Sequence, residues 1–553
     1  MESIFMTPSK LWGDYDPKSG SLDAECVFEE TDGEIIRKKY LFTSEKTDGG
    51  EVRVLCSILQ KKDGAKNSAV LYAADLFKGA DKELILRLAN DGSLVAVIEF
   101  MPTETAPSTV YRGEFAHGKP NAASERFLKA EPSARHTSWF IWAKMIRRAA
   151  VFVGSVLGID DIILAAENTS STAAYMAAGS DSSKTFKGVV SIFGCGYTAY
   201  RGLYKYSGKS LEIDEERQTY ISGIEAQTYV KFLSVPSLML LSTNSEFGDL
   251  DRGMDLFDMT DGDKTLIISP NLRDRITAAA ADNLIMWLNR VFDGGEKRVR
   301  NPQASITVSE DKYYFNLKAP DFDGIESVGV YYSVTNELPY FREWKSLKAE
   351  EVSGGEYIAK IDVDNPAIIF AFANISYKGG EVVSSKCAAK SFDKREPQAR
   401  TPSNRIIYST DTGVTFVPSS KNGLIAEENI ITLAEGAYSI KGVTSSEGAM
   451  INYGVGTTGI NDDDAAAIVF DAYTARDVEF SVNIYKSAEE GLEIYTCRVA
   501  LKASDEWRKT SLSPRMFLMT GNGAVRQADG FGGIKMLEIE GAREVVFNNV
   551  LFV

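Results

Sequence analysis

The sequence predicts an α/β N-terminal half with a doubly wound sheet, followed by two all-β sandwich domains. Short continuous apolar runs alternate with helical patterns up to about residue 295, and only short alternating strands follow them. At 553 residues the chain is also too long for one hydrophobic core. The expected parts are an α/β domain with a strand-rich lead-in (1–295), an immunoglobulin-like sandwich (296–391), a linker (392–404) and a jelly roll (405–553).

Residues 1 to about 60 have the pattern of antiparallel hairpins. Three stretches of alternating apolar and polar residues are separated by the turns Thr31-Asp32-Gly33 and Asp48-Gly49-Gly50. From about residue 68 the pattern changes to the apolar runs SAVLYAA and SLVAVIEF, with the helical stretch DKELILRLANDG between them. A strand, a helix and a second strand in this order predict a parallel sheet with both faces covered.

A long amphipathic helix is predicted over SWFIWAKMIRRAAVFVGSVL, with Arg147 and Arg148 on its polar side. The stretch IILAAENTSSTAAYMAAG, residues 162–179, predicts a buried strand, a tight turn of small residues and a helix. The runs KGVVSIFGCG, VPSLMLLSTN and KTLIISPN predict further strands, and AAADNLIMWLNRVF predicts the last helix. Together these elements predict a doubly wound sheet from about residue 60 to about residue 295.

The turn within residues 162–179 is where a hydrolase with this order of elements presents its nucleophile. In the motif G-x-S-x-G the serine occupies a strained strand-to-helix elbow, and small flanking residues let the backbone turn sharply. The corresponding residues are Ala166-Glu167-Asn168-Thr169-Ser170, so the small flanks remain and asparagine replaces the serine. Because asparagine tolerates a positive φ, we expect the elbow to keep its sharp backbone turn but to lack the nucleophile.

Several segments resemble the α/β-hydrolase family of bacterial acetyl xylan esterases and dienelactone-hydrolase-like proteins. The resemblance covers about residues 10–390. It implies an α/β-hydrolase doubly wound sheet and a relationship to esterases. The segments are LWGDYDP, TSWFIWAKMIRRA, GVVSIFGCGY, LLSTNSEFGDLDRG, DNLIMWLNRVFDGG, VGVYYSV and IIFAFANISYKGG.

The resemblance places the catalytic serine of the family on Asn168 and its acid on the loop of Asp249 and Asp251. The family's histidine falls within NLRDRI, where Asn271 and Asp274 stand instead. The degenerate triad positions are therefore Asn168, Asp249 and Asp274.

The glycine-rich oxyanion loop of the family is also replaced, by Ala73-Ala74-Asp75-Leu76. Three of the four catalytic elements have thus departed from the family's pattern. The residues expected to contact a ligand near the elbow are Glu167, Thr169, Asp251 and Asn271.

The histidines strengthen this comparison. The chain has only His117 and His136, and both precede the elbow, whereas hydrolases of this fold order the triad as serine, acid and histidine. A carboxamide cannot attack as an activated hydroxyl does. We therefore expect a pseudoenzyme that binds a carbohydrate or acylated glycan or acts as a scaffold. The alternatives are an active glycan or ester hydrolase with a site other than the triad, and a structural subunit of an assembly.

Other chemistry stays open at these positions. Ser170 and Ser171 are candidate displaced nucleophiles with His136 as base, although small residues opening a tightly packed helix explain them as well. The nearby carboxylates could form an acid pair, which needs a separation of about 5 to 9.5 Å, or hold a hard cation. These carboxylates are Glu167, Asp249, Asp251 and Asp274.

Residues 405–553 loosely resemble a jelly-roll carbohydrate-binding module, through DVEFSVNIYKS and MLEIEGAREVVFNNVLFV. Trp507 is the one tryptophan of this region and a candidate for stacking on a sugar ring. The acidic loop Asp462-Asp463-Asp464 is a candidate calcium site, with a solvated turn as the alternative. No other cofactor and no other metal site is expected.

Charge and composition exclude several classes of partner. A net charge of -16 argues against nucleic acids and anionic membranes, and no apolar run approaches the roughly 18 residues of a membrane span. Five cysteines without CxxC spacing predict reduced thiols. The first residues lack an apolar core, which predicts a cytoplasmic protein, or an extracellular one if a leader has been removed. A homo-oligomer stays open.

Overall fold

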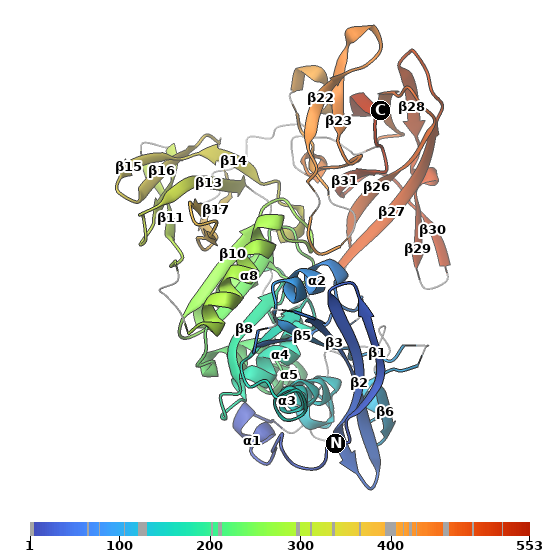
Figure 1. Cartoon of the computed structure of the whole chain (residues 1–553). Coiled ribbons are helices and arrows are strands. Elements are labelled where there is room, and N and C mark those ends of the chain that lie inside the picture. The colour runs from blue at the N-terminus through green and yellow to red at the C-terminus, as the bar shows by residue number, and fades with distance from the viewer. Residues whose placement is uncertain are drawn as a thin grey trace.

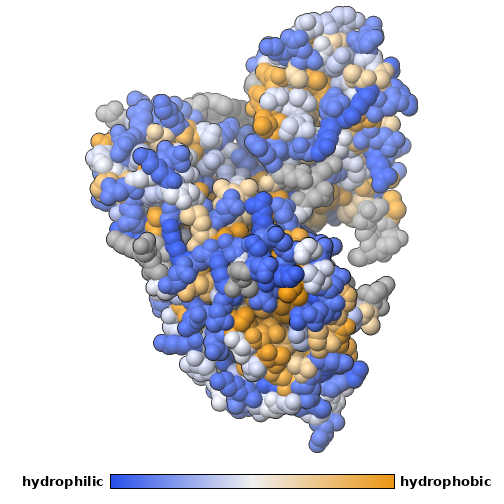
Figure 2. Space-filling view, in the orientation of Figure 1, coloured by the Kyte–Doolittle hydropathy of each residue, from blue (hydrophilic) through white to orange (hydrophobic). Residues whose placement is uncertain are grey.

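The computed structural model shows an N-terminal α/β unit, a middle β unit and a C-terminal β unit (Figure 1). Hydrophilic side chains cover most of the visible surface, and apolar ones gather over the lower part of the N-terminal unit (Figure 2). The structure describes residues 5–63, 66–76, 78–103, 106–119, 130–200, 203–207, 213–294, 299–309, 312–334, 338–363, 366–392, 405–412, 414–419, 423–426, 428–456, 464–488, 491–521 and 524–553.

The N-terminal unit is built on a ten-stranded mixed sheet with the order β1-β2-β3-β5-β4-β7-β8-β9-β10, with β6 paired to β3. Neighbours from β5 to β10 are parallel, and the pairs among β1, β2, β3, β5 and β6 are antiparallel. The strands are β1 (Glu25–Asp32), β2 (Ile35–Thr47), β3 (Gly50–Lys61), β4 (Ala69–Ala73), β5 (Leu94–Ile98), β6 (Val110–Gly113), β7 (Ile162–Glu167), β8 (Phe186–Ile192), β9 (Ser237–Ser242) and β10 (Lys264–Ser269).

The lead-in hairpins are part of this sheet, which corrects the predicted start near residue 60. Strand β3 pairs with β5 through Cys56 and Ile98, so the sheet begins at Glu25. The physical reason is that an isolated hairpin leaves main-chain groups unpaired along its edge, and β5 satisfies them.

Helices cover both faces of the sheet, because alternate residues of each buried strand point to opposite sides. Leu71 and Ala73 pack with α3 to α7, whereas Val70 and Tyr72 pack with α2 and α8. The helices are α1 (Pro8–Trp12), α2 (Lys82–Asn90), α3 (Ser138–Leu157), α4 (Ser170–Gly179), α5 (Glu215–Gly223), α6 (Ala226–Tyr229), α7 (Leu250–Met259) and α8 (Ala278–Phe292).

The two arginines of α3 are buried, which corrects their predicted place on a polar face. Arg147 is 4% exposed and pairs with Asp181, and Arg148 is 2% exposed. Arg148 donates to the carbonyl oxygens of Pro17 and Gly20 at 2.6 and 2.7 Å. The N-terminal loop lies over α3, and Arg148 donates to carbonyl groups that the loop would otherwise bury unpaired, whereas the partners of Arg147, Ser180 and Asp181, follow α4.

The middle unit is a β-sandwich of a four-stranded sheet, β11-β12-β16-β15, and a five-stranded sheet, β14-β13-β17-β18 with β19 on β17. A core with Phe315, Val330 and Ile375 lies between them. The strands are β11 (Gln303–Ser309), β12 (Lys312–Lys318), β13 (Ile325–Val334), β14 (Lys345–Lys348), β15 (Glu350–Ser353), β16 (Glu356–Ile361), β17 (Ile368–Tyr377), β18 (Val382–Ser384) and β19 (Ala388–Ser391).

The C-terminal unit has a six-stranded sheet, β22-β23-β32-β25-β28 with β20, and a seven-stranded sheet, β21-β24-β31-β26-β27-β29-β30. Its strands are β20 (Ile406–Tyr408), β21 (Val417–Pro418), β22 (Ile431–Glu435), β23 (Lys441–Ser445), β24 (Ala449–Asn452), β25 (Ile468–Tyr473), β26 (Val478–Ala488), β27 (Gly491–Leu501), β28 (Arg508–Leu512), β29 (Leu518–Gly521), β30 (Ala524–Gln527), β31 (Ile534–Glu540) and β32 (Val546–Phe552). Most of the predicted linker, residues 393–404, lies outside the described residues.

Both β units pack on the N-terminal unit. Trp344 and Phe370 of the middle unit join the core of the α3 face. Leu424 of the C-terminal unit joins the core of α2 and α8, and its carbonyl oxygen accepts the Ile276 N–H at 2.9 Å. Residues of the middle and C-terminal units thus pack beside the loops at the carboxyl end of the sheet.

The five cysteines make no disulfide. No helix among the described residues is long and apolar enough to cross a membrane.

Candidate functional site

The strand-to-helix elbow joins β7 to α4 at Asn168. Its φ of 49° lies in the left-handed region, and its N–H donates to the carbonyl oxygen of Ile192 at 2.8 Å. Asparagine is one of the few residues with a side chain that adopt this conformation at low cost. The sharp turn expected from the sequence is therefore present, with a carboxamide at its centre.

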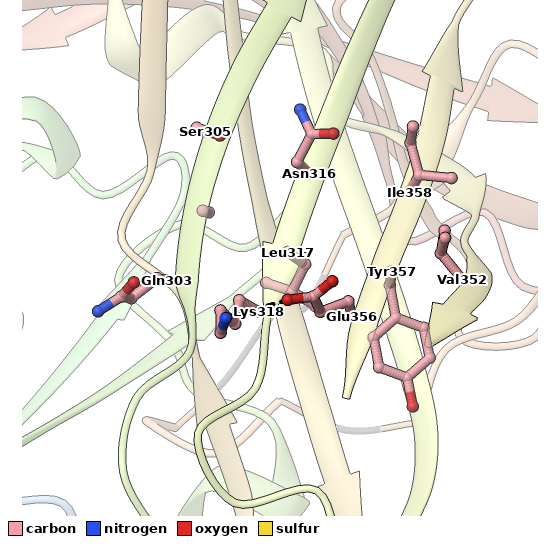
Figure 3. A pocket seen from close by; sticks show the side chains of 10 residues that line it. Gln303, Ser305, Asn316, Leu317, Lys318, Val352, Glu356, Tyr357 and Ile358 are labelled. Atoms are coloured by element: carbon pink, nitrogen blue, oxygen red, sulfur yellow. Dashed lines mark hydrogen bonds and ion pairs between the residues drawn. The ribbon is translucent and has the colours of Figure 1, made fainter. Parts of the chain in front are cut away.

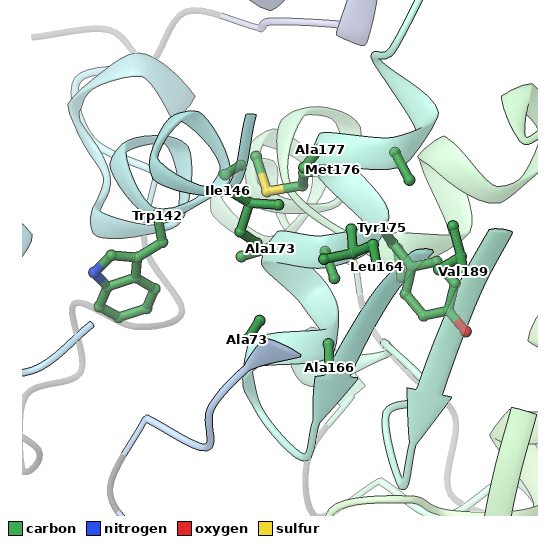
Figure 4. Close-up of a cluster of buried hydrophobic side chains, with 14 of the residues drawn as sticks. Ala73, Trp142, Ile146, Leu164, Ala166, Ala173, Tyr175, Met176, Ala177 and Val189 are labelled. Atoms are coloured by element: carbon green, nitrogen blue, oxygen red, sulfur yellow. The ribbon is translucent and has the colours of Figure 1, made fainter. Parts of the chain in front are cut away.

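Small residues let α4 sit close to the strands beneath it (Figure 4). Ser170 is 0% exposed, and its hydroxyl lies 2.8 Å from the carbonyl oxygen of Ala73 and 2.7 Å from that of Glu167. A Cβ added to Gly194 would lie 1.9 Å from the Cβ of Ser171, which shows how closely the two segments approach. Ser170 and Ser171 are therefore both buried where α4 packs on the strands.

The side chains of Asn168 and Thr169 each hold a buried oxygen that has no hydrogen-bond partner among the described residues. Asn168 is 4% exposed, and its amide oxygen is buried and accepts no hydrogen bond from the described residues. The hydroxyl of Thr169 is in the same situation. Buried polar atoms without a hydrogen-bond partner are uncommon in folded proteins and cost free energy. Each one therefore calls for an explanation other than packing alone.

Glu167 carries the most strongly perturbed carboxyl at the elbow. It is 6% exposed, and its carboxyl accepts the Tyr72 hydroxyl at 2.8 Å. Burial raises the pKa of Glu167 to about 8, because removal from water disfavours the charged form. Glu167 is therefore mostly protonated at neutral pH, which favours a hydrogen-bonding role over a charged one.

The loop after β4 is held by a hydrogen bond between one of its side chains and its own backbone. Asp75 is 4% exposed, and its carboxylate accepts the Lys78 N–H at 2.7 Å. The ammonium of Lys78 lies 5.6 Å from the centre of the Phe247 ring, so this loop contacts the loop after β9.

Asp249, the predicted acid position, is the N-cap of α7. Its carboxylate accepts the N–H groups of Asp251 and Arg252 at 2.9 and 3.2 Å. Burial raises the pKa of Asp249 to about 6, and the neighbouring Asp251 carboxylate adds to this shift. A cap of this kind satisfies helix N–H groups that have no partner within the helix.

Asp251 forms a buried ion pair with Arg342 of the middle unit. Its two oxygens accept Nη1 and Nη2 of Arg342 at 2.7 and 2.6 Å, and Arg342 is 0% exposed. The guanidinium also lies 3.4 Å from the centre of the Phe370 ring. The sequence could not reveal this pair because its members are far apart along the chain.

The loop of Asn271 and Asp274, after β10, is also bonded to other parts of the chain. Asp274, with a φ of 42°, accepts the Ser245 hydroxyl at 2.5 Å and the Glu246 N–H at 3.1 Å. The side chain of Asn271 donates to the Trp344 carbonyl oxygen at 2.9 Å and accepts the Trp344 N–H at 3.3 Å. Both residues therefore join segments of the fold.

Arg273, which the sequence analysis did not single out, connects the same loop to the C-terminal unit. Its guanidinium lies 4.7 Å from the centre of the Tyr485 ring. Burial acts to lower the pKa of Arg273, but Tyr485 and Glu538 outweigh burial and raise it. Glu538 in turn accepts the hydroxyls of Ser419, at 2.7 Å, and of Tyr485. A face of the C-terminal sheet therefore lies against the carboxyl edge.

The two histidines lie in short 3-10 turns, His117 in η1 (Ala116–Gly118) and His136 in η3 (Ala134–His136), near the start of α3. His117 bonds the Glu114 carbonyl oxygen at 2.9 Å, and burial lowers the pKa of His117. His136 bonds Ser133, three residues earlier, at 3.0 Å. This serine–histidine contact is a local turn contact, and neither residue lies on the loops after β7, β9 or β10.

Trp507 is held within the C-terminal unit. Its indole N–H donates to the Ala437 carbonyl oxygen at 3.0 Å, and its ring lies against Gly436. Asp462 and Asp463 of the predicted calcium loop lie outside the described residues. Within the described part of the chain, no group of three or more His, Cys, Asp or Glu could hold a metal ion.

A hollow of about 470 Å³ lies elsewhere, on the outer face of the four-stranded middle sheet (Figure 3). It was not predicted, because its residues are spread over four strands. They are Gln303, Ala304, Ser305, Asn316, Leu317, Lys318, Val352, Glu356, Tyr357 and Ile358.

No protein-family model and no curated protein matches the chain. Among solved structures, it is similar to acetyl xylan esterase 1 from Thermoanaerobacterium sp. JW/SL YS485, at 12% identity and a TM-score of 0.40 over 53% of this chain and 95% of that one. An acetyl xylan esterase from Paenibacillus sp. R4 gives 13% and 0.40, over 49% and 90%. A glucuronoyl esterase from Solibacter usitatus gives 10% and 0.36, over 51% and 90%. These neighbours are α/β-hydrolase-like esterases at low identity, and nothing about the chemistry of this chain follows from them.

Proposed function

We propose that this protein is a catalytically inactive relative of acetyl xylan esterases that binds a carbohydrate or acylated glycan, or holds one as a scaffold. The observation that carries the proposal is Asn168. It occupies the elbow in the left-handed conformation, but it offers a carboxamide where an ester hydrolase needs an activated hydroxyl.

The partners of the remaining positions support the same proposal. Asp249 caps α7, Asp251 is neutralised by Arg342, and Asp274 binds the Ser245 loop. Polar groups that catalysis would require to face a substrate are instead paired with the fold. The glycan in the proposal comes from the sequence resemblance to acetyl xylan esterases.

A carboxylate-based hydrolase is the competing function, and Glu167 is the observation in its favour. A carboxyl with a pKa of about 8 could act as a general acid. The mechanism needs a second, ionised carboxylate facing the same substrate. The nearby candidates Asp249, Asp251 and Asp274 are each bonded within the fold.

The test measures ester hydrolysis with nitrophenyl acetate and acetylated xylan. We expect the wild type to show no turnover above background. Glu167→Gln tests the competing function, because it would abolish any turnover that depends on this carboxyl. Turnover by the wild type that Glu167→Gln abolishes would replace the proposal with the carboxylate mechanism.

The double variant Asn168→Ser with Asp274→His tests whether the elbow supports ester hydrolysis once a serine and a histidine are introduced. Loss of a nucleophile or base costs on the order of 10⁶ in turnover in a serine protease, so even partial restoration is measurable. We expect at most slight activity, because Asp274 also holds the Ser245 loop.

Glycan binding is tested separately by affinity electrophoresis with and without residues 405–553.

A further inference from the structure

We propose that the hollow on the outer face of the four-stranded middle sheet is a binding site for a neutral oligosaccharide chain. The inference rests on the proposed glycan-binding role and gives it a location apart from the elbow and from Trp507. The hollow, at about 470 Å³, has a size typical of ligand sites, which are about 300 to 1,000 Å³.

The antiparallel register builds a grid of polar side chains on this face. Gln303 and Ser305 of β11 lie opposite Lys318 and Asn316 of β12, and Lys318 lies opposite Glu356 of β16. Alternate residues of a strand share a face, so these side chains stand beside one another across three strands, as Figure 3 shows.

The amide and hydroxyl groups of the grid are available for a ligand. The Gln303 amide and the Ser305 hydroxyl make no hydrogen bond with another described residue, and both residues are exposed. Asn316 donates through Nδ2 to the Thr307 hydroxyl at 2.9 Å, and its amide oxygen remains an acceptor. Amides and hydroxyls are both donors and acceptors, which suits the hydroxyl groups of a sugar.

The charge of the hollow favours a neutral ligand. Lys318 and Glu356 form an ion pair across the strands at 3.0 Å, with side chains 66% and 47% exposed. The pair cancels the local charge in a chain whose net charge is -16. An anionic ligand would be repelled by the chain as a whole and would find no unpaired cation here.

Apolar surface at one side of the hollow suits the C–H face of a sugar ring. Val352 of β15 is 66% exposed, and Ile358 of β16 is partly exposed. Phe322, 52% exposed, lies against Gly355, the residue that precedes Glu356. Apolar side chains and hydrogen-bonding amides in one hollow are the two features by which proteins hold the ring face and the hydroxyl groups of a sugar.

An extended peptide fits this surface less well. The main-chain groups of β12 and β16 are paired within the sheet on both sides, so a peptide cannot add to them as a strand. The residues beneath the face, Phe315 and Leu317, point into the core and leave no deep apolar pocket for an anchoring side chain.

The test is affinity electrophoresis of the full chain in gels that contain soluble xylan, β-glucan, galactomannan or the acidic polygalacturonate. We expect at least one neutral polysaccharide to retard the wild type. Gln303→Ala with Asn316→Ala should weaken that retardation at least tenfold, and Phe322→Ala should also weaken it. The matched control, Gln527→Ala, removes an exposed strand glutamine of the C-terminal unit and should change nothing.

Equal retardation of the wild type and the double alanine variant would overturn the location while leaving glycan binding in place. Retardation by polygalacturonate alone, or by none of the four, would overturn the inference itself. Ester turnover by the wild type is a separate result and bears on the proposed function. Thermal melting of each variant checks that it is folded.

Discussion

The carboxyl edge of the N-terminal sheet and the outer face of the middle sheet both carry many polar side chains, but the two regions use them in opposite ways. At the edge, Asp251 is paired with Arg342 and Asp274 with Ser245, all within contacts of the fold. On the outer face, the Gln303 side chain bonds to no described residue. Burial accounts for the pairing of these carboxylates, because a buried polar group without a partner is costly. The elbow differs, since Asn168 and Thr169 each keep a buried oxygen that has no partner among the described residues.

The largest expected effect comes from breaking the buried ion pair. Arg342→Met leaves the Asp251 carboxylate buried without its partner, and we expect the free energy of unfolding to fall by about 3 to 5 kcal/mol. Urea unfolding followed by tryptophan fluorescence measures it. The control is Lys386→Met, which removes a half-exposed pair with Asp258 and should cost less than about 1 kcal/mol. If both variants lost the same free energy of unfolding, the buried pair would be no more important to stability than the exposed one.

A pH effect is expected next, from Glu167. Because its pKa is about 8 in the folded chain and 4.5 in the unfolded one, the folded state keeps a proton that the unfolded state has lost. The resulting stability is full below about pH 4.5 and falls by up to about 1.4 kcal/mol per pH unit until about pH 8.

Glu167→Gln should flatten this part of the curve, measured as the difference in unfolding free energy from the wild type between pH 5 and 8. The control is Glu356→Gln, because the hydrogen bond from Lys318 lowers the pKa of Glu356 and keeps it ionised throughout this range. Parallel curves for the wild type and Glu167→Gln would show that the carboxyl is ionised in the folded state.

Close packing at the elbow gives a smaller effect. Gly194→Ala places a methyl group against Ser171 in the core, and we expect a loss of about 1 to 3 kcal/mol. Gly530→Ala, where the added carbon meets nothing within 4 Å, is the matched control and should be nearly neutral. A neutral Gly194→Ala variant would mean that α4 sits less closely than described.

The left-handed elbow itself should respond by about 1 to 2 kcal/mol. Asn168→Val forces a branched residue into a φ of 49° and should destabilise the chain, whereas Asn168→Gly should be neutral or slightly stabilising. Thermal melting of the pair measures the difference. If the two variants melt together, the turn has relaxed out of the left-handed region.

The smallest effect is expected on the outer face of the middle sheet. Gln303→Ala with Asn316→Ala should change the free energy of unfolding by no more than about 0.5 kcal/mol, because these side chains contribute little to the fold. The same urea experiment tests it. A loss as large as that of Arg342→Met would place these amides among the structural groups.

Part of the site could be predicted from the sequence. The elbow, its asparagine and the small residues beneath it follow from local order along the chain, and Asn168 adopts the expected φ. The partners of Asp251 and Asn271 could not be predicted, because Arg342 and Trp344 come from another unit, 91 and 73 residues away. The outer-face hollow could not be predicted either, because it exists only once four strands are in register.

By itself, the sequence determined the alternation of strands and helices, the change to all-β units after Gly294 and the asparagine at the elbow. These features depend on periodicity and residue type, which are local. Only the tertiary structure decided that the lead-in hairpins belong to the main sheet, that Arg147 and Arg148 are buried and that the edge carboxylates are paired. Those outcomes depend on which residues, distant in the sequence, are buried next to one another. The hydrogen-bond partners of a buried polar group are set by these long-range contacts.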